Sequence, residues 1–224
     1  MDNNQGEKAK PLEEMGAFFS ARIGKYEEHM LRDGNFIYVR VAQRVPTTEN
    51  IKLLDLGCGT GLELDEIFKV NPTVHVTGID LTESMLEKLR QKHAARINQL
   101  NLVLADYFKY DFGTETYDVI LSMQTLHHFV AEDKIRLYKK IKSALKPDGF
   151  YIESDYMAPD QAFEDLHIAE NERRRAEQGI KEGYYHYDIP YTVEHQLEML
   201  QKAGFSNVTI IDREEKGALL EARR

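Results

Sequence analysis

The chain has 224 residues, 42% of them hydrophobic and 30% charged, which is typical of a globular protein with one well-buried core. A net charge of −9 argues against a nucleic-acid partner, because binding a polyanion requires a basic surface. No apolar run approaches the ~20 residues that span a bilayer, and no signal-peptide core is present. The single Cys58 excludes an internal disulfide, so we expect a cytoplasmic protein with no membrane partner. We expect it to be a monomer or homodimer.

The N-terminal segment, residues 1–48, is predicted to form a helical cap. Residues 1–10 are polar, and we expect them to be disordered. From Leu12 to Val45 apolar residues recur at helical spacing, with Gly34 as a break. This pattern predicts two or three short helices.

An apolar strand at 51–56 runs directly into three closely spaced glycines, Gly57, Gly59 and Gly61. Glycine has no Cβ, so the chain can turn tightly and its N–H groups can approach a polar ligand. A helix is predicted at 61–70 from its apolar spacing and early acids. The third glycine comes too early for the dinucleotide fingerprint, and no lysine follows as in a phosphate loop. The loop therefore indicates a small-molecule ligand other than a pyrophosphate.

Strands and helices alternate after this loop. The remaining predicted elements are strand 74–79, helix 83–96, strands 101–105 and 117–123, helix 131–145, strand 149–155, helices 160–178 and 192–203, and a hairpin at 208–211 and 218–220. The alternation indicates an α/β fold with a doubly wound, mostly parallel seven-stranded sheet, an antiparallel C-terminal hairpin and helices on both faces.

The segment 158–189 breaks this alternation after the fifth strand. We expect a helical cap insertion there, which together with the N-terminal helices covers the ligand cleft. The predicted core domain is then residues 49–157 with 190–224. Lys146-Pro147-Asp148-Gly149 predicts a turn between the preceding helix and the fifth strand.

Four stretches in this order resemble the motifs of class I, Rossmann-like S-adenosylmethionine-dependent methyltransferases of the small-molecule type. They are Asp55-Leu-Gly-Cys-Gly-Thr-Gly61, Val74-His-Val-Thr-Gly-Ile-Asp80, Leu102-Val-Leu-Ala-Asp106, and Tyr117-Asp-Val-Ile-Leu-Ser-Met123 with the loop Gln124-Thr-Leu-His-His128. The resemblance implies S-adenosyl-L-methionine as the cofactor and a small molecule as the methyl acceptor.

The resemblance also implies a set of cofactor-binding residues at the carboxyl ends of the strands. The glycine loop would contact the amino-acid part of the cofactor, and Asp55 would hold backbone N–H groups or the methionine amine. Asp80 would accept hydrogen bonds from both ribose hydroxyls, unless it serves as a helix cap. Asp106 would accept from the adenine amino group, a role that Asp111 could share. The implied set is Tyr26, Asp55, Gly57, Cys58, Gly59, Thr60, Gly61, Asp80, Leu81, Met85, Ala105, Asp106, Tyr107 and Met123.

Two histidines are candidate catalytic residues, because methyl transfer requires an aligned acceptor that loses its proton and histidine can accept one near neutral pH. His127 follows the fourth strand, whose loop faces the methyl group in the family that the chain resembles. His186 lies in the predicted roof beside Tyr184, Tyr185 and Tyr187, which are candidate walls of the acceptor pocket. The alternatives are a packing or orienting role for His127 and, for the aromatic residues of the roof, a role in filling the roof's own core.

Two other chemistries are not expected. Cys58 is interpreted as a small residue beside the cofactor rather than a nucleophile. We expect no metal site at His29, His127 and His186, because no Cys/His spacing of a dedicated site is present.

We therefore predict an enzyme that transfers the methyl group of S-adenosylmethionine to an unidentified small molecule by in-line displacement. The insertion ahead of Thr192–Phe205 also resembles enzymes that make carboxy-S-adenosylmethionine, which need a cationic residue that the sequence does not locate. Two competing hypotheses are a non-catalytic S-adenosylmethionine-binding subunit and a dinucleotide-dependent oxidoreductase.

Overall fold

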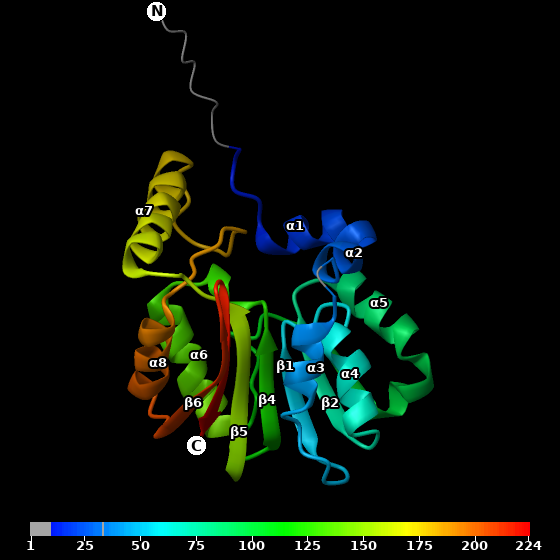
Figure 1. Cartoon of the computed structure of the whole chain (residues 1–224). Coiled ribbons are helices and arrows are strands. Elements are labelled where there is room, and N and C mark those ends of the chain that lie inside the picture. Colours follow the sequence, from blue (N-terminus) through cyan, green and yellow to red (C-terminus); the bar gives the residue numbers. More distant parts are fainter. Residues whose placement is uncertain (1–9, 33) are drawn as a thin grey trace, which may run out of the picture.

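A seven-stranded sheet forms the centre of the computed structural model, which describes residues 10–32 and 34–224 (Figure 1). The expected disorder of residues 1–10 therefore falls almost entirely outside the described residues. The strands are β1 (Lys52–Leu56), β2 (His75–Asp80), β3 (Leu100–Leu104), β4 (Tyr117–Met123), β5 (Leu145–Tyr156), β6 (Asn207–Glu214) and β7 (Gly217–Arg223). Their order across the sheet is β3-β2-β1-β4-β5-β7-β6.

The first five strands pair in parallel, and β7 runs antiparallel to both β5 and β6. The strand order reverses beside β1, since β2 lies on one side of it and β4 on the other. In sheets of this kind, ligands bind beyond the carboxyl ends of the strands at such a reversal. The predicted fold class is confirmed, and it directs the search for a site to the ends of β1, β2 and β4.

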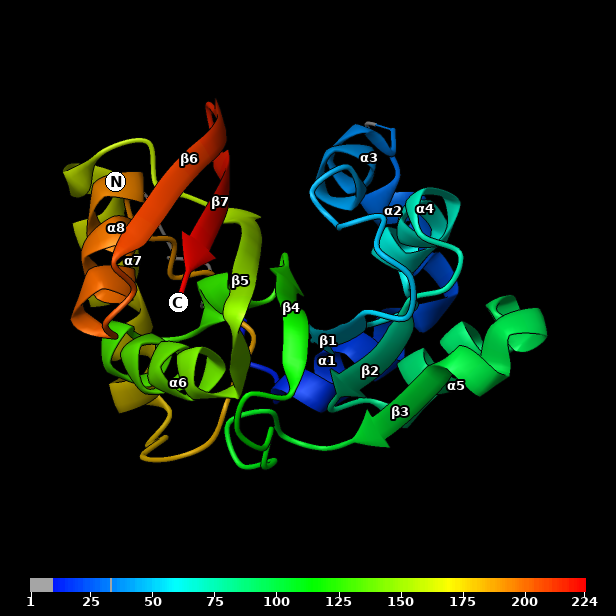
Figure 2. The same cartoon turned by 90° about the horizontal axis from the view of Figure 1, so that it is seen from below.

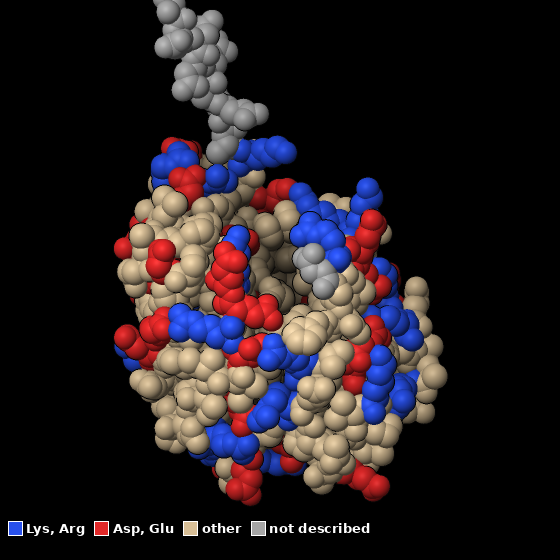
Figure 3. Space-filling view, in the orientation of Figure 1, with Lys and Arg blue, Asp and Glu red and all other residues tan. Residues whose placement is uncertain are grey.

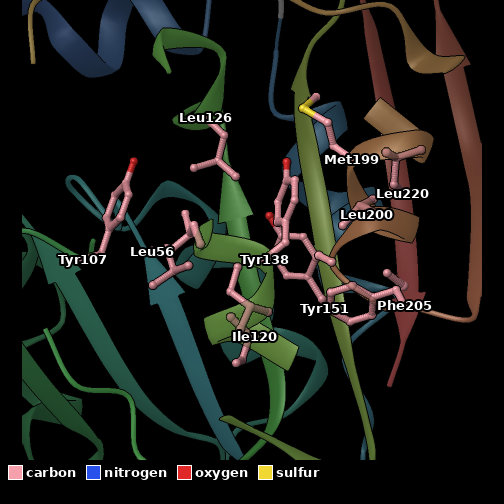
Figure 4. Packing of buried hydrophobic residues seen from close by; sticks show 14 of the residues in the cluster. Leu56, Tyr107, Ile120, Leu126, Tyr138, Tyr151, Met199, Leu200, Phe205 and Leu220 are labelled. Atoms are coloured by element: carbon pink, nitrogen blue, oxygen red, sulfur yellow. The ribbon is translucent and has the colours of Figure 1, made fainter. Parts of the chain in front are cut away.

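Helices cover both faces of the sheet because consecutive strand residues point to opposite sides (Figure 2). Leu53 packs in a core cluster with residues of α3 (Phe36–Ala42), α4 (Leu62–Val70) and α5 (Glu83–Lys92). Leu54 belongs to the cluster on the other face, with residues of α6 (Ala131–Ala144) and α8 (Val193–Lys202). Figure 4 shows part of this second cluster, where Tyr138 and Tyr151 pack beside Phe205 and Leu220.

The remaining helices lie beyond the carboxyl ends of the parallel strands (Figure 1). They are α1 (Met15–Arg22), the short 3-10 helix η1 (Ile23–Lys25), α2 (Tyr26–Met30) and α7 (Gln161–Glu177). The start of α1 bonds to the segment after α7: the Met15 N–H donates to the Tyr184 carbonyl (3.0 Å), and the His186 N–H donates to the carbonyl of Glu13, just before α1 (2.9 Å). We call α1, η1, α2 and residues 184–188 the roof. None of the described helices combines the length and apolarity that a membrane span requires.

Two boundaries differ from the prediction by four residues, and both hairpin strands extend up to three residues beyond their predicted ends. Strand β5 begins at Leu145, immediately after α6, and Lys146-Pro147-Asp148-Gly149 form a bulge opposite Asp118 rather than a separate turn. Asp118 stabilises the bulge by accepting hydrogen bonds from Lys146 Nζ (2.7 and 2.8 Å). The helix predicted at 83–96 ends at Lys92 and continues as the 3-10 helix η2 (Ala94–Gln99).

Candidate cofactor and acceptor site

The glycine loop connects β1 to α4 with its backbone in the left-handed region. Gly57 has φ = 71°, and a Cβ there would collide with the Thr125 side chain from the loop after β4. At Gly59 (φ = 48°) the Tyr26 ring of the roof comes close enough that a Cβ would touch its hydroxyl at 3.5 Å. Gly57 is therefore required by close packing as well as by backbone conformation, whereas Gly59 is favoured by its backbone conformation alone.

The N–H groups of the loop bond within the protein. Those of Gly57 and Cys58 donate to the Ile79 carbonyl (2.8 and 3.2 Å), and that of Gly61 donates to the Cys58 carbonyl (2.8 Å). That of Gly59 donates to Asp80 Oδ2 (2.9 Å). The sequence predicted that loop N–H groups would face a ligand, and for these four the structure shows internal partners instead.

Asp80 connects the end of β2 to the glycine loop. Its second oxygen accepts from the Thr82 N–H (2.8 Å), and Thr82 rather than Asp80 is the N-cap residue of α5. Burial raises the pKa of Asp80, although both backbone donors act to lower it. Each carboxylate oxygen can accept a second hydrogen bond, so Asp80 retains acceptor sites for a sugar.

Behind the loop, three buried polar atoms have no hydrogen-bond partner among the described residues. They are Asp55 Oδ2, Thr60 Oγ1 and Glu63 Oε1. Burial and the neighbouring Glu63 carboxyl raise the pKa of Asp55, and burial raises that of Glu63. One unpartnered oxygen on each of two adjacent carboxyls, beside the Thr60 hydroxyl, fits a positively charged donor such as the ammonium group of S-adenosylmethionine. Sequence reasoning missed Glu63, which looked like an ordinary acid in the first turn of a helix.

The other predicted cofactor residues surround the loop and the end of β3. Asp106 accepts from the Phe108 N–H (2.9 Å) and lies 3.2 Å from Lys109 Nζ. Tyr107 is buried, and its hydroxyl bonds to Thr125 Oγ1 (3.2 Å). Cys58 is buried and burial raises its thiol pKa well above the usual value, which agrees with a packing role. The remaining members are partly buried, Leu81 and Ala105, or buried, Met85 and Met123.

A cavity of about 780 Å³ lies between the roof and the loop after β4. Figure 3 shows a hollow on this face of the molecule, with acidic and basic side chains around its rim. The cavity is lined by Phe18, Phe19, Arg22, Lys25, Tyr26, Glu28, His29, Met30, Arg32, Gln124, His127, His128, Tyr156, His186 and Asp188. Tyr26 and Gln124 also line a much smaller space against the glycine loop, so the cavity lies next to the predicted cofactor position.

The loop after β4 presents His127 to this cavity. Gln124 begins the loop in a left-handed conformation (φ = 50°) that is uncommon for a side chain of its size, and its N–H donates to the Ser154 carbonyl. The chain then forms the 3-10 helix η3 (Leu126–His128), which places His127 Nδ1 2.5 Å from Asp155 Oδ1 near the end of β5. Burial acts to lower the pKa of His127, but the Asp155 carboxylate outweighs it and raises that pKa.

Asp155 is held firmly, because it also accepts from the N–H groups of Leu126 and Tyr156 (2.8 Å each). Burial acts to raise its pKa, but His127 holds it below the usual range. The pair thus leaves Nε2 of His127 as the ring nitrogen that Asp155 does not engage. Sequence reasoning missed Asp155, since it lies 28 residues from His127 on another strand.

Three further polar side chains lie beside this pair. The His128 ring is centred 4.0 Å from that of His127, and the His186 ring is 4.8 Å from that of His128. Burial and the neighbouring His128 lower the pKa of His186 to about 4. Asp188 Oδ1 lies 3.2 Å from His128 Nδ1 and 3.7 Å from His127 Nε2. The structure therefore brings both predicted catalytic histidines to one cavity.

The roof tyrosines do not line this cavity, contrary to one of the two roles predicted for them. Tyr184 packs against Phe108 and Phe129, with ring centres 5.2 and 5.0 Å away. Tyr185 and Tyr187 lie under the guanidinium groups of Arg175 and Arg174. All three fill the interior and flank of the cap because their apolar rings find neighbours there.

A doubly wound sheet with a glycine loop after β1 and a carboxylate at the end of β2 is the arrangement found in nucleoside-binding α/β proteins. The comparisons with known proteins specify the family. Residues 53–149 match the family model described as a methyltransferase domain. A carboxy-S-adenosyl-L-methionine synthase from Wolinella succinogenes is 30% identical over 71% of this chain and 70% of its own length. A phosphoethanolamine N-methyltransferase from Triticum aestivum is 32% identical over 72% of this chain and 29% of its own.

The fold comparison agrees. The S-adenosylmethionine-dependent methyltransferase SibL superimposes with a TM-score of 0.68 at 17% identity, covering 96% of this chain and 63% of SibL. The chain thus spans less than a third of the wheat protein and less than two thirds of SibL. It belongs to the class I, Rossmann-like family of S-adenosylmethionine-dependent methyltransferases, and S-adenosyl-L-methionine is its cofactor.

Proposed function

We propose that the protein transfers the methyl group of S-adenosylmethionine to a small molecule bound in the cavity beneath the roof. The observation that carries this proposal is the Asp155–His127 pair, which faces that cavity beside the glycine loop. S-adenosylmethionine supplies a methyl group already activated by its sulfonium. The chain must therefore align the acceptor and accept the proton that the acceptor loses.

His127 is the proposed proton acceptor. As the acceptor's nucleophilic atom bonds to the methyl carbon, the bond from that carbon to the sulfonium breaks and S-adenosylhomocysteine leaves with the electron pair. The acceptor's proton passes to His127 Nε2, and the Asp155 carboxylate stabilises the imidazolium that forms. Because Asp155 raises the pKa of His127, the ring is a stronger base than free histidine. The rate should fall as the pH drops through this raised pKa. His186, whose pKa is low, is the weaker candidate.

The predicted cofactor residues are assigned from their positions. Asp55, Thr60 and Glu63 would hold the methionine end, since their orphaned atoms fit an ammonium group. Asp80 would bind the ribose and Asp106 the adenine, with Tyr26 covering the loop. We also propose residues 1–48 and 158–189 as a cap on a domain formed by 49–157 and 190–224, with the exception of α3, which packs on one face of the sheet.

A small acceptor is supported by the cavity and by one relative. The cavity volume of about 780 Å³ lies within the usual range of small-molecule pockets. The wheat relative is named for phosphoethanolamine, a small molecule.

A carboxy-S-adenosylmethionine synthase is the second candidate, favoured by the similarity to the Wolinella succinogenes protein of that name. The cavity contains cationic side chains that a carboxylate requires, Arg22 and Lys25, although Arg22 is already paired with Glu13 at 2.8 Å. Mass spectrometry of the ligand that copurifies with the protein separates the two candidates, because a carboxylated cofactor is heavier by one carbon dioxide.

An acceptor screen tests the main proposal. S-adenosylhomocysteine should form with at least one acceptor, and the variants His127→Gln and His186→Gln should show which histidine the reaction needs. The exposed His75, on the opposite end of β2, gives the control variant His75→Gln. Tight cofactor binding without turnover across the screen would instead support a non-catalytic binding subunit.

A further inference from the structure

Three side chains on the cavity wall converge on one point. One ring nitrogen of His127, one ring nitrogen of His128 and a carboxylate oxygen of Asp188 all lie within 4.8 Å of one another. Asp188 Oδ1 is 3.2 Å from the His128 nitrogen and 3.7 Å from the His127 nitrogen. Zinc binds nitrogen and oxygen ligands at about 2.0–2.2 Å, so ligands in a tetrahedral site lie roughly 3.4 Å apart. The observed spacing is close to that of a metal centre.

The carboxylate oxygen in this group faces the two imidazole rings. Asp188 Oδ1 is buried, and its nearest polar neighbours are His128 Nδ1 (3.2 Å) and His127 Nε2 (3.7 Å). The His128 nitrogen also lies 3.3 Å from the Tyr187 carbonyl. A cation bound among the carboxylate and the two rings would replace these contacts with direct coordination.

His127 is already oriented as metal-binding histidines are. Such histidines donate the N–H of one ring nitrogen to a carboxylate or carbonyl, which fixes the tautomer and frees the other nitrogen for the metal. Here Nδ1 of His127 hydrogen-bonds to Asp155 Oδ1 at 2.5 Å. Asp155 is itself held in place because it accepts hydrogen bonds from the Leu126 and Tyr156 N–H groups. This outer support is independent of Asp188, because it lies on β5 and Asp188 lies in the roof.

We propose that His127, His128 and Asp188 form a binding site for one divalent transition-metal ion of the zinc type. Two imidazoles and a carboxylate are ligands that such ions prefer, and three protein ligands leave a position open toward the cavity. The ion occupies the same Nε2 that the proposed proton transfer uses. A metal-loaded protein therefore cannot use His127 as a base. No metal site was expected at His29, His127 and His186, and the proposed group differs from that set by containing His128 and Asp188.

Zinc titration of the full chain tests the site. The protein should carry no histidine tag and should be stripped with a chelator before Zn²⁺ is added in competition with a chromophoric indicator. We expect one ion per chain. The variants His128→Gln and Asp188→Asn should each weaken binding by at least about tenfold, and Asp155→Asn, which changes only the support behind His127, by about 10–100-fold. His29→Gln is the matched control, because His29 lines the same cavity outside the three-residue group.

Two measurements keep the result unambiguous. Cobalt(II) bound in place of zinc should give a visible absorption spectrum that changes in His128→Gln and not in His29→Gln. Calorimetry with S-adenosylhomocysteine should show that each variant still binds the cofactor product, so that lost metal affinity does not reflect unfolding. Two results would refute the metal site and leave the methyl-transfer proposal standing. One is a wild-type protein that binds the cofactor product but takes up no zinc. The other is a His29→Gln variant whose zinc affinity falls as much as that of His128→Gln or Asp188→Asn.

Discussion

The buried Asp55 and Glu63 carboxyls behind the glycine loop predict that cofactor binding depends on pH. Burial raises the pKa of Glu63 to about 7. Burial and the neighbouring Glu63 carboxyl also raise the pKa of Asp55 well above its usual value. The free protein therefore holds a proton on this pair near neutral pH, since two adjacent buried carboxyls resist double ionisation. An ammonium group placed against them favours the ionised form. Binding should release a proton, and affinity should rise with pH.

The magnitude follows from the pKa of Glu63. One pH unit below it, at about pH 6, roughly a tenth of the side chains are ionised, and one unit above it, at about pH 8, roughly nine tenths are. If only the ionised pair accepts the ammonium, the association constant for S-adenosylhomocysteine rises about tenfold between these conditions, or ~1.4 kcal/mol. The variant Glu63→Gln cannot ionise, so its affinity should stay flat over the same range.

Isothermal titration calorimetry measures this directly. Titrations in two buffers with different ionisation enthalpies also count the protons released at each pH. Glu66→Gln is the matched control, because Glu66 lies one turn further along α4 and pairs with Lys69. Equal wild-type affinity at both pH values, or a Glu63→Gln variant that retains the wild-type slope, would refute the assignment of this pair to the methionine end.

Three other changes have defined outcomes. Replacing Asp80 by alanine removes a charged acceptor for two backbone N–H groups and for the proposed ribose contact. Because each charged hydrogen bond contributes ~1.5–3 kcal/mol, the affinity for S-adenosylhomocysteine measured by calorimetry should fall by at least about tenfold. An unchanged affinity would exclude the ribose role. His127→Gln should lower turnover by about 10²–10⁴-fold while leaving cofactor-product affinity intact, measured once an acceptor is known; a loss of both would point to a structural role. Gly57→Ala should destabilise the fold by about 1–3 kcal/mol in thermal unfolding, because the Thr125 side chain occupies the position of the added Cβ. Gly179→Ala should destabilise it less, since Gly179 has a similar φ of 66° but no neighbour near its Cβ position.

The sequence was sufficient for the architecture because local patterns determine it. Seven strands, their alternation with helices and the glycine loop all depend on residues close together in the chain. The start of β5 was predicted four residues late, since Pro147 and Gly149 indicate a turn unless Asp118 on the neighbouring strand is there to stabilise a bulge.

The candidate site could be predicted only in part, because its contacts join residues that lie far apart in the chain. His127 and His186 could be identified from their type and position, but the acids that define their surroundings lie far along the chain or in another layer. Asp155 is on β5 and Asp188 in the roof, and nothing in their local sequence marks them as partners of histidines. Glu63 likewise stands out only when its burial beside Asp55 is known.

The way the roof is fastened has a consequence for ligand exchange. Glu13 and Met15, at the start of α1, form two backbone hydrogen bonds with residues 184–186, and the Leu12 N–H donates to Gln178 Oε1 (2.9 Å). The Phe18 ring stacks on His186 at 3.4 Å, and Phe19 also contacts that ring. These links are fewer than the hydrogen bonds that join the strands of the sheet, so we expect this region to open locally at a lower free energy than the sheet. Admission of an acceptor and departure of the spent nucleoside would then need only a brief local separation of these two segments, and the frequency of that separation would set an upper limit on turnover.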